Sequence, residues 1–262
     1  MLKYLLIYIF LFLLTACYEP QVLVKKYNPA MVSLNLGYMP RPTSFDSTRS
    51  AVYISGGFMK DYQEFSPVNG SEDMLSLGVF SINKGLIYKN VNFAYGADFF
   101  AGNFKNKSLK ASDPGYFNKM SLSGVKFKSS LNYYQTIRSF DLRIIGFDLA
   151  YSKEFGDFAK FRKVISNTEN RYAIPATSLL SGGLSSEIIF KTRRSFIKRY
   201  GFGINLRTTF NDLTYQGLDE NGQKGGIKSG FAPSWSIYVQ TKHLYFVGES
   251  SKSGSMNLGY RF

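Results

Sequence analysis

The sequence predicts an all-β protein, a transmembrane antiparallel up-and-down β-barrel of about 10–12 strands with an N-terminal lipid anchor. Three observations predict this fold. Apolar and polar residues alternate with period two in several segments, these segments are long, and aromatic residues are abundant, with 24 Phe and 19 Tyr among 262 residues. No segment beyond residue 17 approaches 18 consecutive apolar residues. Strands, rather than helices, would therefore cross the membrane.

Period-two alternation identifies the strands and their two faces. It places Phe202 and Ile204 on a face expected to meet lipid, and Gly203 and Asn205 on a face expected to meet the lumen. A soluble β-sandwich shares this pattern, but its strands usually run about five or six residues, whereas membrane-crossing strands need roughly 9–11. Alternation is clearest at 32–38, 91–103, 196–211 and 255–262. Extended character continues for longer than a sandwich strand requires around 86–104, 139–155, 178–192 and 195–212.

Short and long connections are expected to alternate along the chain, as they do when short turns face the periplasm and long loops face the exterior. This alternation leaves the terminal Phe262 on the periplasmic side. Counting strands from residue 30 gives about eleven, but bacterial single-chain barrels have an even number. Either residues 21–27 add a first strand and make twelve, or one strand is absent and ten remain. Short links are expected near 83–85, 138–139, 193–194 and 241–242, and longer polar stretches at about 61–72, 105–118, 156–177 and 213–229.

The first 17 residues resemble a bacterial lipoprotein export signal. Lys3 precedes an apolar run that ends at Leu14 and is too short to span a bilayer as a finished helix. The box Leu14-Thr15-Ala16-Cys17 resembles the site of bacterial signal peptidase II. This resemblance implies that residues 1–16 are cleaved and that acyl chains such as palmitate are attached to Cys17. No disulfide can form within the chain, because Cys17 is its one cysteine.

The predicted export signal divides the chain into three parts. Residues 1–16 would be the signal peptide, residues 17–29 a lipidated tether that includes the first strand if there are twelve, and residues 30–262 the barrel. The box at Cys17, the following Tyr18-Glu19-Pro20, the Gly-aromatic alternation and the terminal Phe262 together resemble outer-membrane β-barrel lipoproteins of the Bacteroidetes type. The resemblance implies a barrel in the bacterial outer membrane, anchored through Cys17. It also implies a role as an accessory or scaffold subunit of an outer-membrane complex for assembly, secretion or import.

The chain is strongly basic, with 32 Lys and Arg against 18 Asp and Glu and a formal net charge of +14. A basic soluble domain would suggest nucleic acid, but an exported lipoprotein meets lipid phosphates instead. We therefore expect outer-membrane lipids, lipopolysaccharide and other outer-membrane proteins as partners, and no nucleic acid. The densest basic cluster is predicted to contact anionic lipid or a partner, although the same charges could simply solvate a rim; it comprises Lys191, Arg193, Arg194, Lys198 and Arg199.

One stretch, residues 157–165, has helical spacing instead of alternation. Asp157 is a suitable N-cap, and Phe158, Phe161 and Ile165 fall on one face. The predicted short amphipathic helix could fold over the mouth of the barrel or dock a partner.

Candidate catalytic groups are scarce. The chain has one histidine, His243, and no local spacing pairs it with a particular serine. No cysteine pair or histidine cluster has metal-ligand spacing, so we expect no catalytic site, no metal and no cofactor. Three functions stay open: a non-enzymatic scaffold, a small diffusion channel that favours anions because Arg199 and Arg207 fall on the inward face, and a lipid-modifying enzyme that uses His243.

Overall fold

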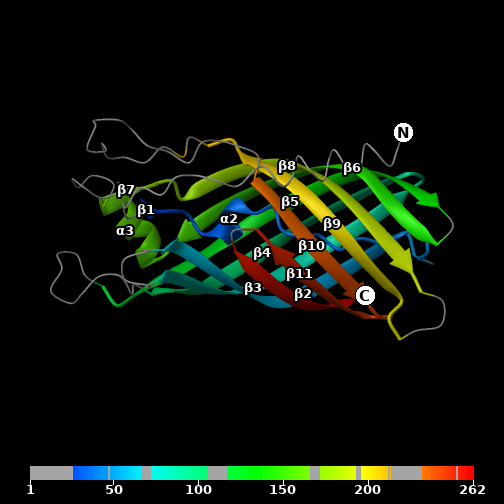
Figure 1. The fold of residues 1–262 in the computed structure, drawn as a ribbon, viewed down its shortest axis with the longest axis horizontal. Helices are drawn as coiled ribbons and strands as arrows, with labels where there is room; N and C mark the ends of the chain where they lie inside the picture. The colour runs from blue at the N-terminus through cyan, green and yellow to red at the C-terminus, as the bar shows by residue number, and fades with distance from the viewer. Residues whose placement is uncertain are drawn as a thin grey trace.

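Ten strands of the computed structural model close into an antiparallel barrel, in the order β10-β11-β12-β2-β3-β4-β5-β6-β8-β9 (Figure 1). The structure describes residues 26–46, 48–65, 72–105, 117–137, 139–165, 172–192, 196–211, 213, 232–251 and 253–262. The barrel strands are β2 (Ser50–Phe65), β3 (Glu72–Tyr88), β4 (Val91–Lys105), β5 (Lys119–Ile137), β6 (Phe140–Phe155), β8 (Ser178–Lys191), β9 (Arg199–Thr209), β10 (Ala232–Gln240), β11 (Leu244–Ser250) and β12 (Gly254–Arg261). The remaining elements are β1 (Lys26–Tyr27), α2 (Met31–Leu34), α3 (Asp157–Ile165) and β7 (Tyr172–Ala173).

The closed antiparallel barrel confirms the all-β barrel of the predicted fold class, and ten is the number of its strands. The predicted lipid anchor at Cys17 lies outside the described residues. The strand predicted at 32–38 is wrong, because Met31–Leu34 form the helix α2 and the following residues run inside the barrel. The alternative first strand at 21–27 does not join the barrel either. Lys26–Tyr27 pair in parallel with Tyr172–Ala173 of β7, and residues 21–25 lie outside the described part of the chain.

The outward faces of all ten barrel strands carry exposed apolar side chains. Phe202 is 44% exposed, as the alternation predicts, while its neighbours Gly201 and Gly203 face inward and are buried. Isolated exposed apolar residues are ordinary, but a contiguous apolar surface marks contact with lipid or with another apolar body. Such a band is typical of outer-membrane barrels; it includes Phe58, Phe80, Phe99, Phe127, Leu149, Leu184, Phe202, Ile237, Phe246 and Leu258.

The two ends of the barrel differ in their connections. The short-turn rim carries the β3–β4, β5–β6, β8–β9 and β10–β11 connections together with the C-terminus. The long-loop rim carries the connections 66–71, 106–118, 156–177 and 210–231 and, as its one short link, the β11–β12 turn at 251–253. In Figure 1 the long-loop rim, with α3, β1 and β7, lies at the left and the C-terminus lies toward the other end. One predicted link is wrong, since residues 83–85 lie within β3, which continues to Tyr88 before turning at Lys89 and Asn90.

The predicted amphipathic helix is confirmed as α3, which packs over the long-loop rim. Phe158 is fully buried and stacks on Phe104 of β4 with ring centroids 4.3 Å apart. Phe161 meets the ring of Tyr27 edge-on at 5.2 Å, so α3 also fixes the start of the described chain at this rim. The apolar face of α3 thus belongs to the main hydrophobic cluster of the barrel.

Within the described residues, none of the helices is long and apolar enough to cross a membrane.

Candidate functional site: the occupied lumen and the short-turn rim

Residues 28–46, here called the luminal segment, run through the inside of the barrel from the long-loop rim to the short-turn rim. Pro29, Pro40 and Pro42 each fix their own φ and favour an extended conformation for the residue before them. Gly37 has a φ of +73°, and a Cβ added there would lie 3.0 Å from Nζ of Lys126. Only glycine suits that combination of conformation and space. The local sequence therefore favours an irregular chain that can follow the lumen, not a wall strand.

Contacts with β6 show the direction of the luminal segment. Its residues meet β6 in reverse order along the two chains, so the segment runs antiparallel to that strand for most of the barrel's length. The four contacts are Ala30 N–H to Oε1 of Glu154 at 2.8 Å, Oγ–H of Ser152 to the carbonyl of Ser33 at 3.0 Å, Arg41 to Asp148 at 3.9 Å, and Ser44 N–H to Oδ2 of Asp141 at 2.9 Å.

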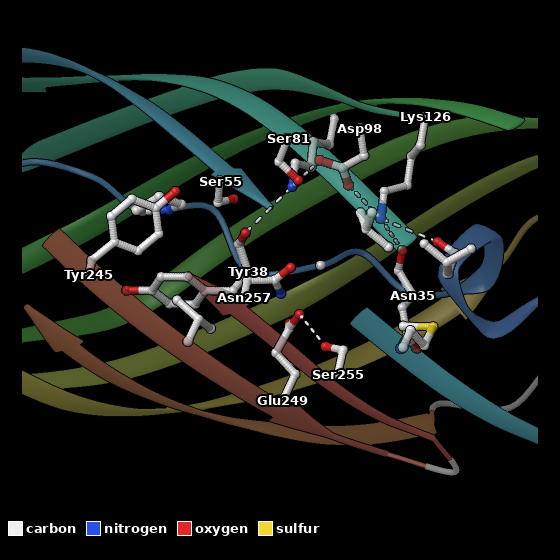
Figure 2. A pocket seen from close by; sticks show the side chains of 17 residues that line it. Asn35, Tyr38, Ser55, Ser81, Asp98, Lys126, Tyr245, Glu249, Ser255 and Asn257 are labelled. Atoms are coloured by element: carbon white, nitrogen blue, oxygen red, sulfur yellow. Dashed lines mark hydrogen bonds and ion pairs between the residues drawn. The ribbon is translucent and has the colours of Figure 1, made fainter. Parts of the chain in front are cut away.

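A buried charge cluster holds the middle of the luminal segment (Figure 2). Asp98 of β4 lies 2.9 Å from Nζ of Lys126 and 2.8 Å from Nζ of Lys128, both on β5. Lys126 also donates to the carbonyls of Val32 and Asn35, at 3.2 and 3.3 Å. Because Asp98 and Lys126 are each only 2% exposed, the ammonium groups depend on these partners and not on bulk water. The wall charges thus stabilise the segment's backbone.

A second buried group lies further toward the short-turn rim. The hydroxyl of Tyr38 donates to Oε1 of Glu187 on β8 at 2.6 Å, and the other oxygen of Glu187 forms an ion pair with Arg143 of β6. Arg143 is 1% exposed, so breaking this pair would leave a charge in a site without water. Tyr38 is therefore connected to two wall strands through one carboxylate.

Asp46 fixes the end of the luminal segment at the short-turn rim. Its carboxylate accepts hydrogen bonds from Arg199 of β9 at 2.8 Å, from Arg261 of β12 at 2.6 Å and from the backbone N–H of Thr43 at 2.7 Å. Burial alone would raise the pKa of Asp46, but the two guanidinium groups outweigh it and hold that pKa below its ordinary value. The charged form of Asp46 is therefore the bound form.

Acidification should weaken this contact. A carboxyl whose pKa is depressed in the folded state stabilises the fold above its unfolded pKa of about 4 and loses that contribution as the pH falls further. We expect the free energy of unfolding to drop between about pH 5 and pH 2. Asp46→Asn should lower stability at pH 7 by roughly 1.5–3 kcal/mol, the usual worth of hydrogen bonds to charged groups. Denaturant titrations at several pH values measure both effects. A variant that keeps the full wild-type acid dependence would contradict this role for Asp46.

Little space is left in the lumen. The cavity between the luminal segment and the wall, bordered by Tyr38, Asp98, Lys126, Glu249 and Ser255, measures about 30 Å³ (Figure 2). A second cavity, on the other side of Tyr38 and next to Arg41, measures about 20 Å³. A water molecule needs roughly 10–15 Å³ on this measure. Each of these two spaces accommodates at most a few water molecules and no larger solute.

The structure divides the predicted basic cluster. Lys191 and Lys198 lie exposed at the short-turn rim, with Nζ of Lys191 placed 5.1 Å from the ring centre of Phe45. Arg199 instead points into the lumen, where it is 7% exposed and bound to Asp46. Arg193 and Arg194 lie outside the described residues, as does Cys17. Arg199 is thus committed to an internal ion pair.

His243 lies at the short-turn rim, in the connection between β10 and β11. Its ring stacks on Tyr260 at 5.4 Å, and its Nδ1 lies 3.4 Å from the carbonyl oxygen of Arg261. One contact is with the face of an aromatic ring and the other with a backbone carbonyl. They position the imidazole on the rim, and neither joins it to a hydroxyl oxygen.

Sequence reasoning placed Arg199 and Arg207 inward but missed the acidic residues that oppose the inward cations. Asp98 and Asp148 stand at inward positions of alternating strands, where a buried carboxylate needs a cation. Inward charged residues in the middle of a strand were therefore an available signal. Their partners were not readable, because Asp46 and Arg261 are 215 positions apart.

Comparison with known proteins gives no family. No protein-family model and no curated protein sequence matches the chain. Among solved structures it is similar to the transport unit of the autotransporter AIDA-I from Escherichia coli, with a TM-score of 0.43, 11% identity and coverage of 88% of this chain and 95% of that one. It is also similar to the translocator domain of the autotransporter NalP from Neisseria meningitidis, with a TM-score of 0.34, 11% identity and coverage of 84% and 90%. The Pseudomonas putida toluene transporter TodX gives 0.36, 9% identity and coverage of 83% and 69%. The chain is a ten-stranded β-barrel, and these distant likenesses assign it no activity.

Proposed function

We propose that the protein is a closed, lipid-anchored barrel of the bacterial outer membrane that works as a non-enzymatic accessory or scaffold subunit of an outer-membrane complex. The apolar band around all ten strands supports insertion in a membrane. The acyl anchor at Cys17 is part of this proposal. Its partners would be other outer-membrane proteins, together with the phosphates of lipids or lipopolysaccharide.

The observation that carries the proposal is the occupied lumen. A diffusion channel needs a continuous aqueous path, but residues 28–46 fill the barrel and are bound to six of its strands, β2, β5, β6, β8, β9 and β12. The inward Arg199, which would have favoured anions in an open pore, is neutralised by Asp46. What the barrel offers to other molecules is therefore its outer wall and its two rims.

The short-turn rim supplies the charges for a partner contact in this proposal. Lys191 and Lys198 are exposed there, and Arg193 and Arg194 lie between them in the sequence. On the orientation in which short turns face the periplasm, this rim would meet inner-leaflet headgroups or an acidic periplasmic surface.

Charge reversal tests this role. We expect the double variant Lys191→Glu, Lys198→Glu to lose a stoichiometric partner that the wild type retains in a native pull-down from mild detergent. Binding by the wild type should also weaken as the salt concentration rises from about 50 to about 300 mM. Over this range salt screens the interaction between exposed charges, since the screening length is roughly 10 Å at 0.1 M.

The matched control reverses two exposed lysines at the opposite rim, Lys105 and Lys119, which are cross-strand neighbours on β4 and β5. This control should keep the partner. Equal loss from both double variants would show a general effect of net charge and no specific contact. Steady ion conductance of the purified wild-type protein in planar bilayers would favour the channel instead.

A further inference from the structure

The side on which the N-terminal part of the chain leaves the barrel is not settled by the anchor itself, but it can be derived from the luminal segment. Ser50 begins β2 at the short-turn rim, in register with Leu86 just before the turn at Lys89. At the other end, Lys26 and Tyr27 pair with β7, which precedes the start of β8 at the long-loop rim. The chain that precedes Lys26 therefore starts from the long-loop rim.

The contacts leave no ambiguity about this direction. Tyr27 meets Phe104 near the end of β4, at a centroid distance of 6.2 Å, and Phe161 of α3. From there the four contacts with β6 descend from Glu154 to Asp141, and the course ends at Asp46 between Arg199 and Arg261. The segment passes the whole membrane-spanning height inside the barrel before the first wall strand begins.

We propose that the chain before Lys26 emerges on the outer side of the membrane and that the acyl chains of Cys17 insert in the outer leaflet. The inference rests on the proposed lipidation and on the orientation with long loops outside. Cys17 precedes Lys26 by nine residues, a reach of about 30 Å when fully extended. The lumen offers no return path, because the luminal segment already fills it.

A return to the inner leaflet through lipid is excluded on energetic grounds. The connecting residues would have to cross an apolar layer of roughly 25–30 Å with unpaired backbone groups. They would also carry the charges of Glu19 and Lys25 through that layer. An outer-leaflet anchor requires neither. The protein would then be displayed at the cell surface by its lipid while its C-terminus stays at the opposite rim.

Cysteines introduced one at a time, with Cys17 retained, test this topology in intact cells of the native host. The reporters are Gln21→Cys in the tether, Lys160→Cys on the exposed face of α3 as the long-loop reference, and Lys242→Cys in the β10–β11 turn as the short-turn reference. The probe is a membrane-impermeant polyethylene glycol maleimide, and heat-dependent mobility on gels checks that each barrel is folded. We expect Gln21→Cys and Lys160→Cys to react in intact cells, and Lys242→Cys to react only after lysis.

Two outcomes would overturn the proposal: reaction of Gln21→Cys only after lysis while Lys160→Cys reacts in intact cells, or reaction of Lys242→Cys in intact cells with Lys160→Cys protected. The wild type tests lipidation separately. An acylated Cys17 has no free thiol and should not react at all, whereas a reactive Cys17 would remove the anchor from the proposed function. In that case its own labelling before and after lysis would still report the side on which the chain emerges.

Discussion

Replacing Glu154 by Ala is expected to lower the free energy of unfolding by about 3–5 kcal/mol, the usual result of leaving one partner of a buried ion pair alone. Glu154 is 2% exposed; one of its oxygens accepts the N–H of Ala30, and the other pairs with Arg162 of α3, which is fully buried. The substitution therefore leaves a guanidinium without a counter-charge and releases the start of the luminal segment together with the helix above it.

Unfolding by guanidinium chloride, with the protein inserted in lipid vesicles, measures the loss of unfolding free energy. The one tryptophan, Trp235, faces outward on β10 and is 45% exposed, so its fluorescence reports whether the wall is still inserted. The control removes both charges, as Glu154→Gln with Arg162→Met. Because the double variant leaves no buried charge alone, and the amide oxygen of Gln can still accept the N–H of Ala30, it should recover most of the lost stability. A cost below about 1 kcal/mol for Glu154→Ala would mean that water reaches the pair.

Leu149→Arg should have the next largest effect, at about 2–4 kcal/mol, because it places a charge at mid-height of the lipid-facing wall. Leu149 is 52% exposed on β6 and lies within an outward apolar run that extends from Ile145 to Tyr151. Ile137→Arg is the matched control for depth, since Ile137 also faces outward but ends β5 at the short-turn rim. Its cost should fall to roughly 0–1 kcal/mol.

The same vesicle titration measures both arginine variants, with Trp235 as the probe. Equal tolerance of the two substitutions would contradict the assignment of the apolar band to lipid. It would mean that the outward face of the barrel does not meet the hydrocarbon of a membrane.

The wall of the barrel was predictable, because period-two alternation reports a surface with one side buried and the other in contact with lipid. Phe202 and Ile204 are outward for this reason, and the 3.6-residue spacing of Phe158 and Phe161 predicted α3. The alternation at 32–38 predicted a wall strand wrongly, because a chain that lies inside the barrel is enclosed on all sides and has no exposed face. Ser33, on the polar face of that expected strand, is as buried as Val32 on its apolar face.

The candidate site was only partly predictable. Inward charges such as Arg199 could be located by alternation, but the contacts that fill the lumen join residues far apart in the sequence: Lys126 and Val32 are 94 positions apart, and Ala30 and Glu154 are 124. Nothing in local sequence identifies such partners, because they meet only after ten strands have closed into a ring. The same long separations hid the role of Asp46.

A ring with a chain running through it also restricts the order in which it can be made. The luminal segment leads directly into β2, and β2 pairs with the last strand, β12, to complete the circle. If that pairing came first, the luminal segment would have to be drawn through an already closed ring, and such threading is essentially absent from folded proteins. The segment must instead lie against the concave face of a still open sheet, with Lys126, Glu154 and Asp148 as its early contacts. Biogenesis is therefore a wrapping reaction, in which the luminal segment, synthesised before every wall strand, is the template around which the strands close.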